Sequence, residues 1–252
     1  MKLAVAGGSG TVGRHVVHAA HSAGHDVVVL TREAGADVVT GTGLAGMLDG
    51  VDAVIDVTNL FTTSAGRARH FFESATRNLM DAGVRAGVGH HVALSIVGID
   101  DIDASYYAGK LAQERAVREG PVPHTIARAA QFHEFAGQLL AGMKGPVVVM
   151  PRMLMRPVAC REIGAHLVAV AETGPVGRAP DLVGPRDEEL ADLARRQLRF
   201  DGIRRGVLDL RLPGTYGAGL ASGSLRGGAD ATHGVLTFDD WLRSSDHARR
   251  AS

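Results

Sequence analysis

The sequence predicts an α/β fold in which helices cover both faces of a doubly wound, mostly parallel sheet. Short apolar segments rich in β-branched residues alternate with longer segments of helical periodicity, as in repeated β-α-β units. Some strand segments, such as 53–57, are almost continuously apolar, which is typical of strands buried on both faces. Glycine supplies 33 of the 252 residues, and several glycines stand where a helix should end.

The expected elements follow one another from the N-terminus. Helical periodicity predicts helices at 12–23, 67–86, 106–118, 131–141 and 161–172. Gly24, Gly87, Gly120 and Gly174 are expected to close four of them, because a helix C-cap favours positive φ. The segment 34–48 is short and broken by glycine, so it predicts a trimmed second crossover. The expected strands are 2–6, 26–30, 36–39, 51–57, 90–96, 124–127 and 146–150.

The regular alternation weakens beyond residue 150. We therefore expect a core domain over 1–150 and a smaller C-terminal lobe over 151–252 that is integrated with it. The lobe contains a charged helical segment at 186–200 and an alternating segment at 206–212. Open α/β sheets bind ligands at the carboxyl ends of their strands, so we expect the lobe to cover that edge and bind the substrate. The small-residue run 214–223 fits either close helix packing or a subunit contact in a homodimer.

Composition and charge narrow the class of protein. Lys+Arg and Asp+Glu both number 27, so no net charge draws the chain to nucleic acid or to an anionic membrane, and we expect neither as a partner. The single cysteine, Cys160, excludes an internal disulfide framework, and we expect a small core residue in a cytoplasmic protein. The N-terminus reaches Gly7 before any apolar run of signal-peptide length, and no later run approaches a membrane span.

A glycine-rich turn follows the first expected strand and opens the first expected helix. It satisfies both G-x-G-x-x-G and G-x-x-G-x-x-G. Glycine permits the tight turn and a close approach to a pyrophosphate, while the helix N-terminus offers free N–H groups to the anion. This context predicts dinucleotide binding, and the alternative is a glycine-rich turn without a ligand. The expected cofactor-binding residues are Gly7, Gly8, Ser9, Gly10, Thr11, Val12 and Gly13.

Thr31 and Arg32 follow the second expected strand. A site that prefers NAD would carry an acidic residue here for the ribose 2′-hydroxyl, whereas a guanidinium beside a hydroxyl suits a 2′-phosphate. The sequence therefore favours NADP(H) over NAD(H) as the cofactor. In the alternative, Arg32 is a solvated arginine paired with Glu33, and NAD stays open.

Further segments carry a family resemblance. Ser95 closes the expected strand 90–96, and Tyr106-Tyr107-Ala108-Gly109-Lys110 opens the next helix. With these segments the chain resembles the short-chain dehydrogenase/reductase superfamily, and most closely its atypical, NmrA-like branch of NAD(P)H-binding reductases and redox sensors. The resemblance covers nearly the whole chain and implies a Rossmann-type fold. The other matching segments are 50–55, 77–79, 110–114, 125–132 and 237–242.

The resemblance implies three catalytic residues. In that superfamily a tyrosine donates a proton, and a lysine four residues later lowers the pKa of the tyrosine and holds the nicotinamide ribose. Tyr106 and Lys110 have this spacing, which places them on the same side of a helix, and Ser95 would orient the substrate carbonyl. NmrA-like chains often keep the lysine without a working tyrosine. The alternatives are therefore Tyr107 as the proton donor, or an aromatic pair that only packs.

The resemblance also implies cofactor contacts after later strands. The chain departs from the family at Thr42, where relatives carry an acidic residue for the adenine amino group, and at Ala130, where they commonly carry proline. The implied contacts are Thr58 and Asn59 after the segment 51–57, Gln131 after 124–127, Ser95 and Lys110.

Other polar residues receive mainly structural interpretations. His133 follows a strand and is expected either to face the substrate or to start a helix. No metal site is expected, because His15, His18 and His21 do not share one helix face and no carboxylate lies near them in sequence. The basic residues Arg195, Arg196, Arg199, Arg204 and Arg205 interleave with acids, which favours a solvated, self-paired helix face.

Together these patterns predict an NADP(H)-dependent oxidoreductase of the atypical short-chain type, acting on a carbonyl, quinone or enone small molecule. A non-catalytic NADP(H)-binding redox sensor is the alternative. The substrate is expected to be apolar, because a methionine-rich segment suggests an adaptable apolar pocket, although the same residues fit a core equally well. These residues are Met150, Met153, Leu154 and Met155.

Overall fold

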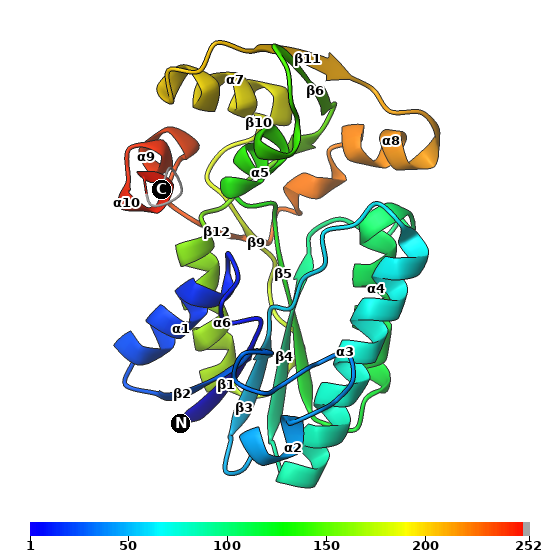
Figure 1. The fold of residues 1–252 in the computed structure, drawn as a ribbon, viewed down its shortest axis with the longest axis vertical. Coiled ribbons are helices and arrows are strands. Elements are labelled where there is room, and N and C mark those ends of the chain that lie inside the picture. Colours follow the sequence, from blue (N-terminus) through cyan, green and yellow to red (C-terminus); the bar gives the residue numbers. More distant parts are fainter. Residues whose placement is uncertain (249–252) are drawn as a thin grey trace. The chain divides into compact units, whose positions relative to one another are not determined.

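The computed structural model describes residues 1–248, which form two compact units (Figure 1). The first unit consists of Met1–Ser95, Asp103–Arg128 and Arg161–Pro180. The second consists of Ile96–Ile102, Ala129–Cys160 and the chain from Asp181 onward. The chain therefore crosses between the units several times, and the expected boundary at residue 150 lies inside the second unit.

The first unit is built on a parallel sheet whose strand order is β5-β4-β3-β1-β2, with β8 beside β5. β1 pairs in parallel with both β2 and β3, and β3 pairs in parallel with β4. The order reverses between β1 and β3, so this sheet is doubly wound as predicted, and its topological switch point lies between the ends of these two strands. The strands are β1 Lys2–Ala6, β2 Asp26–Leu30, β3 Ala53–Asp56, β4 His90–Ile96, β5 His124–Ala129 and β8 Gly177–Arg178.

Helices cover both faces of this sheet: α1 and α6 lie on one side, and α3 and α4 on the other (Figure 1). Glycine lets both helix pairs approach closely. A Cβ on Gly109 would stand 2.6 Å from the Ala68 Cβ, and one on Gly164 would stand 2.6 Å from the His15 carbonyl carbon. The helices are α1 Gly13–Ser22, α2 Leu44–Met47, α3 Ala65–Ala86, α4 Ser105–Glu119 and α6 Cys160–Thr173.

Two local predictions in the first unit are wrong. The segment 36–39 forms a turn instead of a strand, because the Asp37 carboxylate accepts hydrogen bonds from the Val39 and Thr40 amides while Asn78 donates to the Val38 and Val39 carbonyls. The trimmed crossover thus reduces to α2.

Gly120 is the second wrong prediction, because its φ is −72°. Proline follows at position 121 and disfavours the helical region for the residue before it, so the chain leaves α4 in an extended conformation. The other three expected caps, Gly24, Gly87 and Gly174, do have positive φ.

The second unit contains short sheets packed with helices. β6 pairs in parallel with β11, β7 antiparallel with β10, and β9 in parallel with β12, while Leu182 of β9 also pairs with Ala129. The strands are β6 Val147–Pro151, β7 Leu154–Met155, β9 Leu182–Val183, β10 Glu188–Glu189, β11 Gly206–Leu210 and β12 Thr232–His233. The helices are α5 Glu134–Gly142, α7 Leu190–Phe200, α8 Gly214–Ala221, η1 Ser224–Arg226, α9 Phe238–Leu242 and α10 Ser245–Ala248.

Packing in the second unit settles several open sequence interpretations. Met150, Met153 and Met155 are buried core residues. Gly219 of the small-residue run packs closely, since a Cβ there would stand 2.7 Å from Ile102. α7 begins at Leu190, later than expected, because the preceding glutamates pair with β7. Among the described residues, no helix is both long and apolar enough to cross a membrane.

Candidate nucleotide-binding site

The glycine turn between β1 and α1 lies at the topological switch point of the sheet, where open α/β sheets bind their ligands. Gly7 has a φ of +82°, and the turn is closed by the Gly10 amide, which donates to the Gly7 carbonyl at 3.0 Å. A Cβ on Gly13 would stand 2.0 Å from the Gly7 carbonyl oxygen, and one on Gly8 would stand 2.6 Å from Val29. The protein's own packing therefore requires glycine at 7, 8 and 13.

Gly10 is different, because the protein does not fill the space beside it. A Cβ on Gly10 would meet one atom within 4 Å, the Gly7 carbonyl oxygen at 3.1 Å, and the residue is exposed. Glycine at this position leaves the backbone open to close approach from outside the chain, which is what a pyrophosphate needs. The residues present thus fit a dinucleotide phosphate.

The electrostatics at the N-terminus of α1 also favour a bound anion. Its N-cap residue, Val12, has no side chain that can cap the helix, and no acidic residue stands in the first turn. The Arg14 and His15 amides donate to the Gly10 and Val12 carbonyls, so an external anion would be held by the positive end of the helix dipole and by amides that precede Arg14. Ser9 is exposed and Thr11 half-buried at this end of the helix.

The loop after β3 lies against the glycine turn. A Cβ on Gly7 would stand 2.9 Å from the Val57 carbonyl oxygen and 3.1 Å from the Thr58 Cα. The Thr58 amide donates to the Asp56 carboxylate at 2.9 Å, which fixes the loop at the strand end. Asn59 is exposed at this edge. The structure therefore brings the predicted contacts Thr58 and Asn59 beside the glycine turn.

Thr31 and Arg32 begin at the same edge, because Ala6 pairs with Leu30 in the sheet. The Thr31 carbonyl and hydroxyl oxygens accept from amides of the following turn, including that of Ala34. Arg32 is exposed, and within residues 1–248 it forms no ion pair with Glu33. Its guanidinium is available to an external anion.

Lys110 is buried, and its ammonium is occupied within the first unit. It donates to the Leu94 carbonyl at 2.6 Å and to the Gln113 side-chain oxygen, and it lies 4.6 Å from the centre of the Phe72 ring. Two of its three N–H donors are thus used by the protein, and the Phe72 ring covers the ammonium as well. Burial lowers the pKa of Lys110 to about 8, against the opposing effects of Asp56 and Glu114.

The chain of hydrogen bonds continues from Lys110 to the nucleotide loop. Gln113 donates to the second oxygen of the Asp56 carboxylate at 2.8 Å, while the first oxygen holds the Thr58 amide. Sequence reasoning missed Asp56 and Gln113 as site-supporting residues. The available signal was a single carboxylate inside the otherwise apolar strand segment 53–57.

Tyr106 directs its hydroxyl to a different partner from that of Lys110. The hydroxyl donates to the Asn59 side-chain oxygen at 2.8 Å, and the ring packs edge-on against Phe72 and Tyr107. Burial raises the pKa of Tyr106. The predicted pair is therefore on one helix, but each polar group is engaged elsewhere.

Ser95, the third predicted catalytic residue, is buried beside Glu114. Glu114 accepts from Arg128 at 2.7 and 2.8 Å and from Arg118 at 2.7 Å. Burial opposes ionisation of Glu114, but the hydrogen bonds from Arg128 and the charges of Arg128 and Arg118 hold its pKa below the usual range. The buried Glu114–Arg128 pair joins α4 to β5, and Arg128, like Asp56, is a polar residue inside a strand whose pattern predicts apolar residues.

Two predicted residues belong to the second unit. Gln131 is buried, and its carbonyl accepts from the Val158 amide at 3.0 Å. His133 is buried at the start of α5, where Nε2 lies 2.9 Å from the Leu236 carbonyl and the ring packs against Phe238 and Trp241. Over residues 1–248, no three His, Cys, Asp or Glu side chains group so as to hold a metal ion.

Comparisons with known proteins bear on this site. The sequence model of a family described as NAD(P)H-binding matches residues 7–145, which include the glycine turn, Arg32 and Lys110. No curated protein sequence matches significantly.

Solved structures resemble the chain over nearly its full length. One is a dTDP-4-dehydrorhamnose reductase from Clostridium acetobutylicum, 15% identical, with a TM-score of 0.73 over 99% of this chain and 100% of that one. Another is an NADPH-dependent quinone oxidoreductase from Escherichia coli, 16% identical, with a TM-score of 0.72 over 96% and 98%. A third is a UDP-N-acetylglucosamine 4-epimerase from Bacillus cereus, 17% identical, with a TM-score of 0.71 over 100% and 97%.

These structures share the fold, so the Rossmann-type prediction is confirmed. The family model covers more than half of the sequence and agrees with the resemblance found from the motifs. The chain belongs to the NAD(P)H-binding family.

Proposed function

We propose that the protein is an NADP(H)-dependent oxidoreductase that reduces a small-molecule acceptor. The observation that carries this proposal is the glycine turn at the switch point, where Gly10 leaves open space and the N-terminus of α1 is uncapped. When bound, a reduced nicotinamide supplies a hydride. The role of the glycine turn is then to bind the dinucleotide phosphates in one fixed position.

The preference for NADP(H) rests on Arg32. Its guanidinium is exposed and unpaired within residues 1–248, and it stands at the end of β2 beside the hydroxyl of Thr31. This arrangement favours a 2′-phosphate through charge-assisted hydrogen bonds. The fold alone does not determine the preference between NADP(H) and NAD(H), because similar structures were solved with NADPH and with NAD.

Among carbonyl, enone and quinone acceptors, the surroundings of Tyr106 favour a quinone. A simple ketone needs a strong proton donor as hydride arrives, yet burial raises the pKa of Tyr106 and its hydroxyl proton is held by Asn59. A quinone takes up the hydride to form a hydroquinone monoanion, a phenolate that is about as basic as tyrosinate and takes the one proton it still needs from water. Tyr106 remains the proposed proton donor for any ketone substrate, with Lys110 and Ser95 as supporting residues.

One observation favours a second function, that of a non-catalytic NADP(H)-binding redox sensor. The polar groups of Tyr106 and Lys110 are both engaged by the protein, so neither is prepared for catalysis. The sensor and the reductase share the cofactor site and differ in turnover.

The deciding experiment measures NADPH oxidation at 340 nm with a panel of quinones, enones and ketones, together with NADPH affinity. A reductase binds NADPH in the micromolar range and oxidises it with at least one quinone. Binding without turnover across the whole panel would refute the reductase and leave the sensor.

A further inference from the structure

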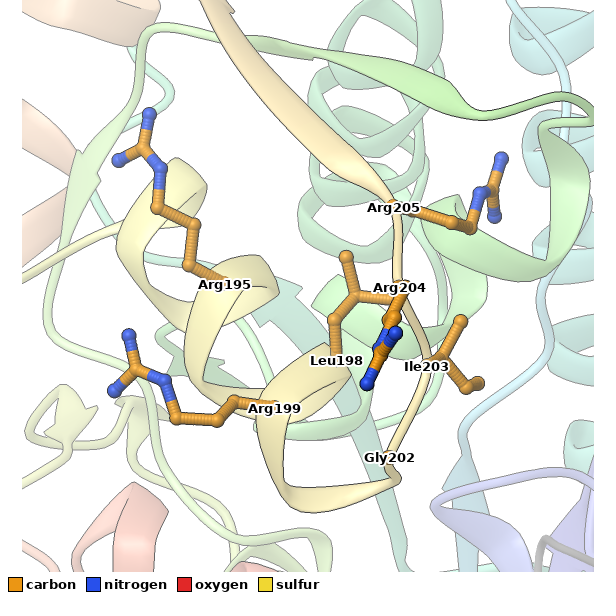
Figure 2. Close-up of a pocket in the computed structure, with 7 residues that line it drawn as sticks. All are labelled: Arg195, Leu198, Arg199, Gly202, Ile203, Arg204 and Arg205. Carbon is orange, nitrogen blue, oxygen red and sulfur yellow. The ribbon is translucent and has the colours of Figure 1, made fainter.

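The second unit carries an open depression of about 520 Å³ at the C-terminal half of α7 and the connection to β11 (Figure 2). We call it the arginine depression, because four of its lining side chains are arginines and none is acidic. This surface belongs to no part of the cofactor site described above. The lining residues are Arg195, Leu198, Arg199, Gly202, Ile203, Arg204 and Arg205.

Two of these arginines are engaged by the protein. Arg195 donates to the Asp192 carboxylate at 2.6 Å and to the Val207 carbonyl at 3.2 Å. Arg205 donates to the carbonyls of Leu140, Met143 and Gly145, so it ties the end of α5 to the start of β6. Arg205 therefore has a structural role.

Arg199 and Arg204 are both exposed, and neither guanidinium has a hydrogen bond or ion pair with residues 1–248. The nearest acid in sequence, Asp201, is paired with His247 at 2.7 Å. The expectation of a fully self-paired helix face is thus wrong for these two residues, although it holds for Arg195 and Arg196. The local positive charge is left for an external acid.

Large apolar side chains are exposed next to these charges. Ile203 is 50% exposed within the depression, and Phe200, beside Arg199, is 51% exposed. Leu198 is buried at its base. Arginine and aromatic residues together are enriched at the centres of protein interfaces, whereas a purely solvated face has no use for exposed apolar groups.

The arrangement of the guanidiniums decides the class of ligand. They spread around the depression instead of converging, with Arg205 turned away from Arg195 and Arg199 (Figure 2). A single phosphate or carboxylate would contact only one of them well. Arg195 uses two of its five N–H donors on Asp192 and Val207, so it can still bind a further carboxylate. It lies one helical turn from Arg199, about 6 Å along the axis, which matches two carboxylates at the same spacing on another helix. Nucleic acid fits less well, because its phosphates would leave Ile203 and Phe200 exposed.

We propose that the arginine depression binds an acidic, amphipathic segment of a partner protein, with carboxylates on Arg195, Arg199 and Arg204 and an apolar side chain on Ile203. This proposal is independent of the cofactor site, so either can fail without the other.

The test is fluorescence anisotropy with a labelled 16-residue helical peptide that carries glutamates at i, i+4 spacing beside leucines. The full-length wild type should bind it, and Arg199→Ala/Arg204→Ala should bind about tenfold more weakly, as expected for two exposed ion pairs. Arg186→Ala/Arg211→Ala loses the same charge from exposed positions outside the depression and should stay within twofold of wild type. Emission of the single tryptophan, Trp241, reports that each variant is folded.

Two further measurements test the apolar contact and the need for carboxylates separately. Ile203→Ser should also weaken binding, and the same peptide with glutamine in place of glutamate should bind far less. The proposal is overturned if the wild type does not bind the acidic peptide, or if both double variants bind it equally well. It is equally overturned if a 20-nucleotide single-stranded DNA, or citrate as a competitor, binds the arginines more tightly than the peptide does.

Discussion

Substitution of Gly10 by alanine tests the reasoning about the glycine turn, because it separates affinity from stability. The added Cβ would meet only the Gly7 carbonyl oxygen at 3.1 Å, so a shift of a few tenths of an ångström suffices. The cost of that shift is offset by about 0.4–1 kcal/mol from the stiffer unfolded chain. We therefore expect the free energy of unfolding to change by less than about 1 kcal/mol, or about 2–4 °C in Tm.

The affinity for NADPH should respond much more strongly. The same methyl group would occupy the space through which a pyrophosphate approaches the backbone, and would remove one charge-assisted hydrogen bond worth about 1.5–3 kcal/mol. This corresponds to a Kd about 10- to 150-fold higher. The assay is a titration that follows NADPH fluorescence, combined with thermal melting of the same samples.

Two matched glycines serve as controls. Gly66, exposed in the first turn of α3, has no atom within 4 Å of a Cβ, so Gly66→Ala should leave the affinity unchanged and raise the free energy of unfolding by at most about 1 kcal/mol. Gly13→Ala would place a Cβ 2.0 Å from the Gly7 carbonyl oxygen and should destabilise the fold by about 3 kcal/mol or more. If Gly10→Ala binds NADPH as tightly as the wild type, the pyrophosphate does not approach Gly10 and the reasoning is wrong.

The remaining predictions concern the cation at the edge of the sheet and the buried residues of α4. Arg32→Ala should lower the preference for NADPH over NADH at least about tenfold, while Arg85→Ala, at another exposed position, should leave it unchanged. If the two variants change this preference equally, the 2′-phosphate assignment is refuted. Lys110 has a pKa lowered to about 8, below the unfolded value of 10.5, so the unfolded chain binds more protons above pH 8 and stability should rise with pH there. Between pH 8 and 9.5 the wild type should gain about 1.5 kcal/mol in chemical denaturation relative to Lys110→Met, and parallel curves would contradict the burial of the ammonium. Tyr106→Phe should leave NADPH affinity unchanged and keep the rate of quinone reduction within about threefold of wild type. The same variant should reduce any ketone about 100-fold or more slowly in steady-state assays. An equal loss of rate with both acceptors would show that the phenol acts on quinones as well.

Local sequence patterns predicted the parts of the site that depend on the backbone. The turn from Gly7 to Gly13 could be located because a strand, a glycine turn and a helix must occur in that order for a phosphate to be bound. β1, β2 and β4 were predicted with the bounds they have in the structure, because each is a short apolar run with turn residues at its ends. These features follow from neighbours in the chain.

Side-chain partners from distant segments could not be predicted in the same way. The i, i+4 spacing places Tyr106 and Lys110 on one helix side, but a lysine side chain is long, and its ammonium goes where acceptors lie. Those acceptors, the Leu94 carbonyl and Gln113, come from β4 and from the next turn of α4, and Asp56 on β3 anchors Gln113 in turn.

The division into two units was also beyond the sequence pattern. Segments such as Arg161–Pro180 return to the first unit after a long excursion, and no local signal marks such a return. The wrong strand at 36–39 has a similar cause, because the amide of Asn78, 39 residues from Val39, takes up carbonyls that a sheet would have used.

A crystal structure of the protein with NADPH tests the central claim most directly. We expect the pyrophosphate oxygens within hydrogen-bond distance of backbone amides of residues 9–13, close against Gly10, and the 2′-phosphate on the guanidinium of Arg32. A dinucleotide bound with its pyrophosphate away from the glycine turn, or no bound dinucleotide at millimolar NADPH, would contradict the account.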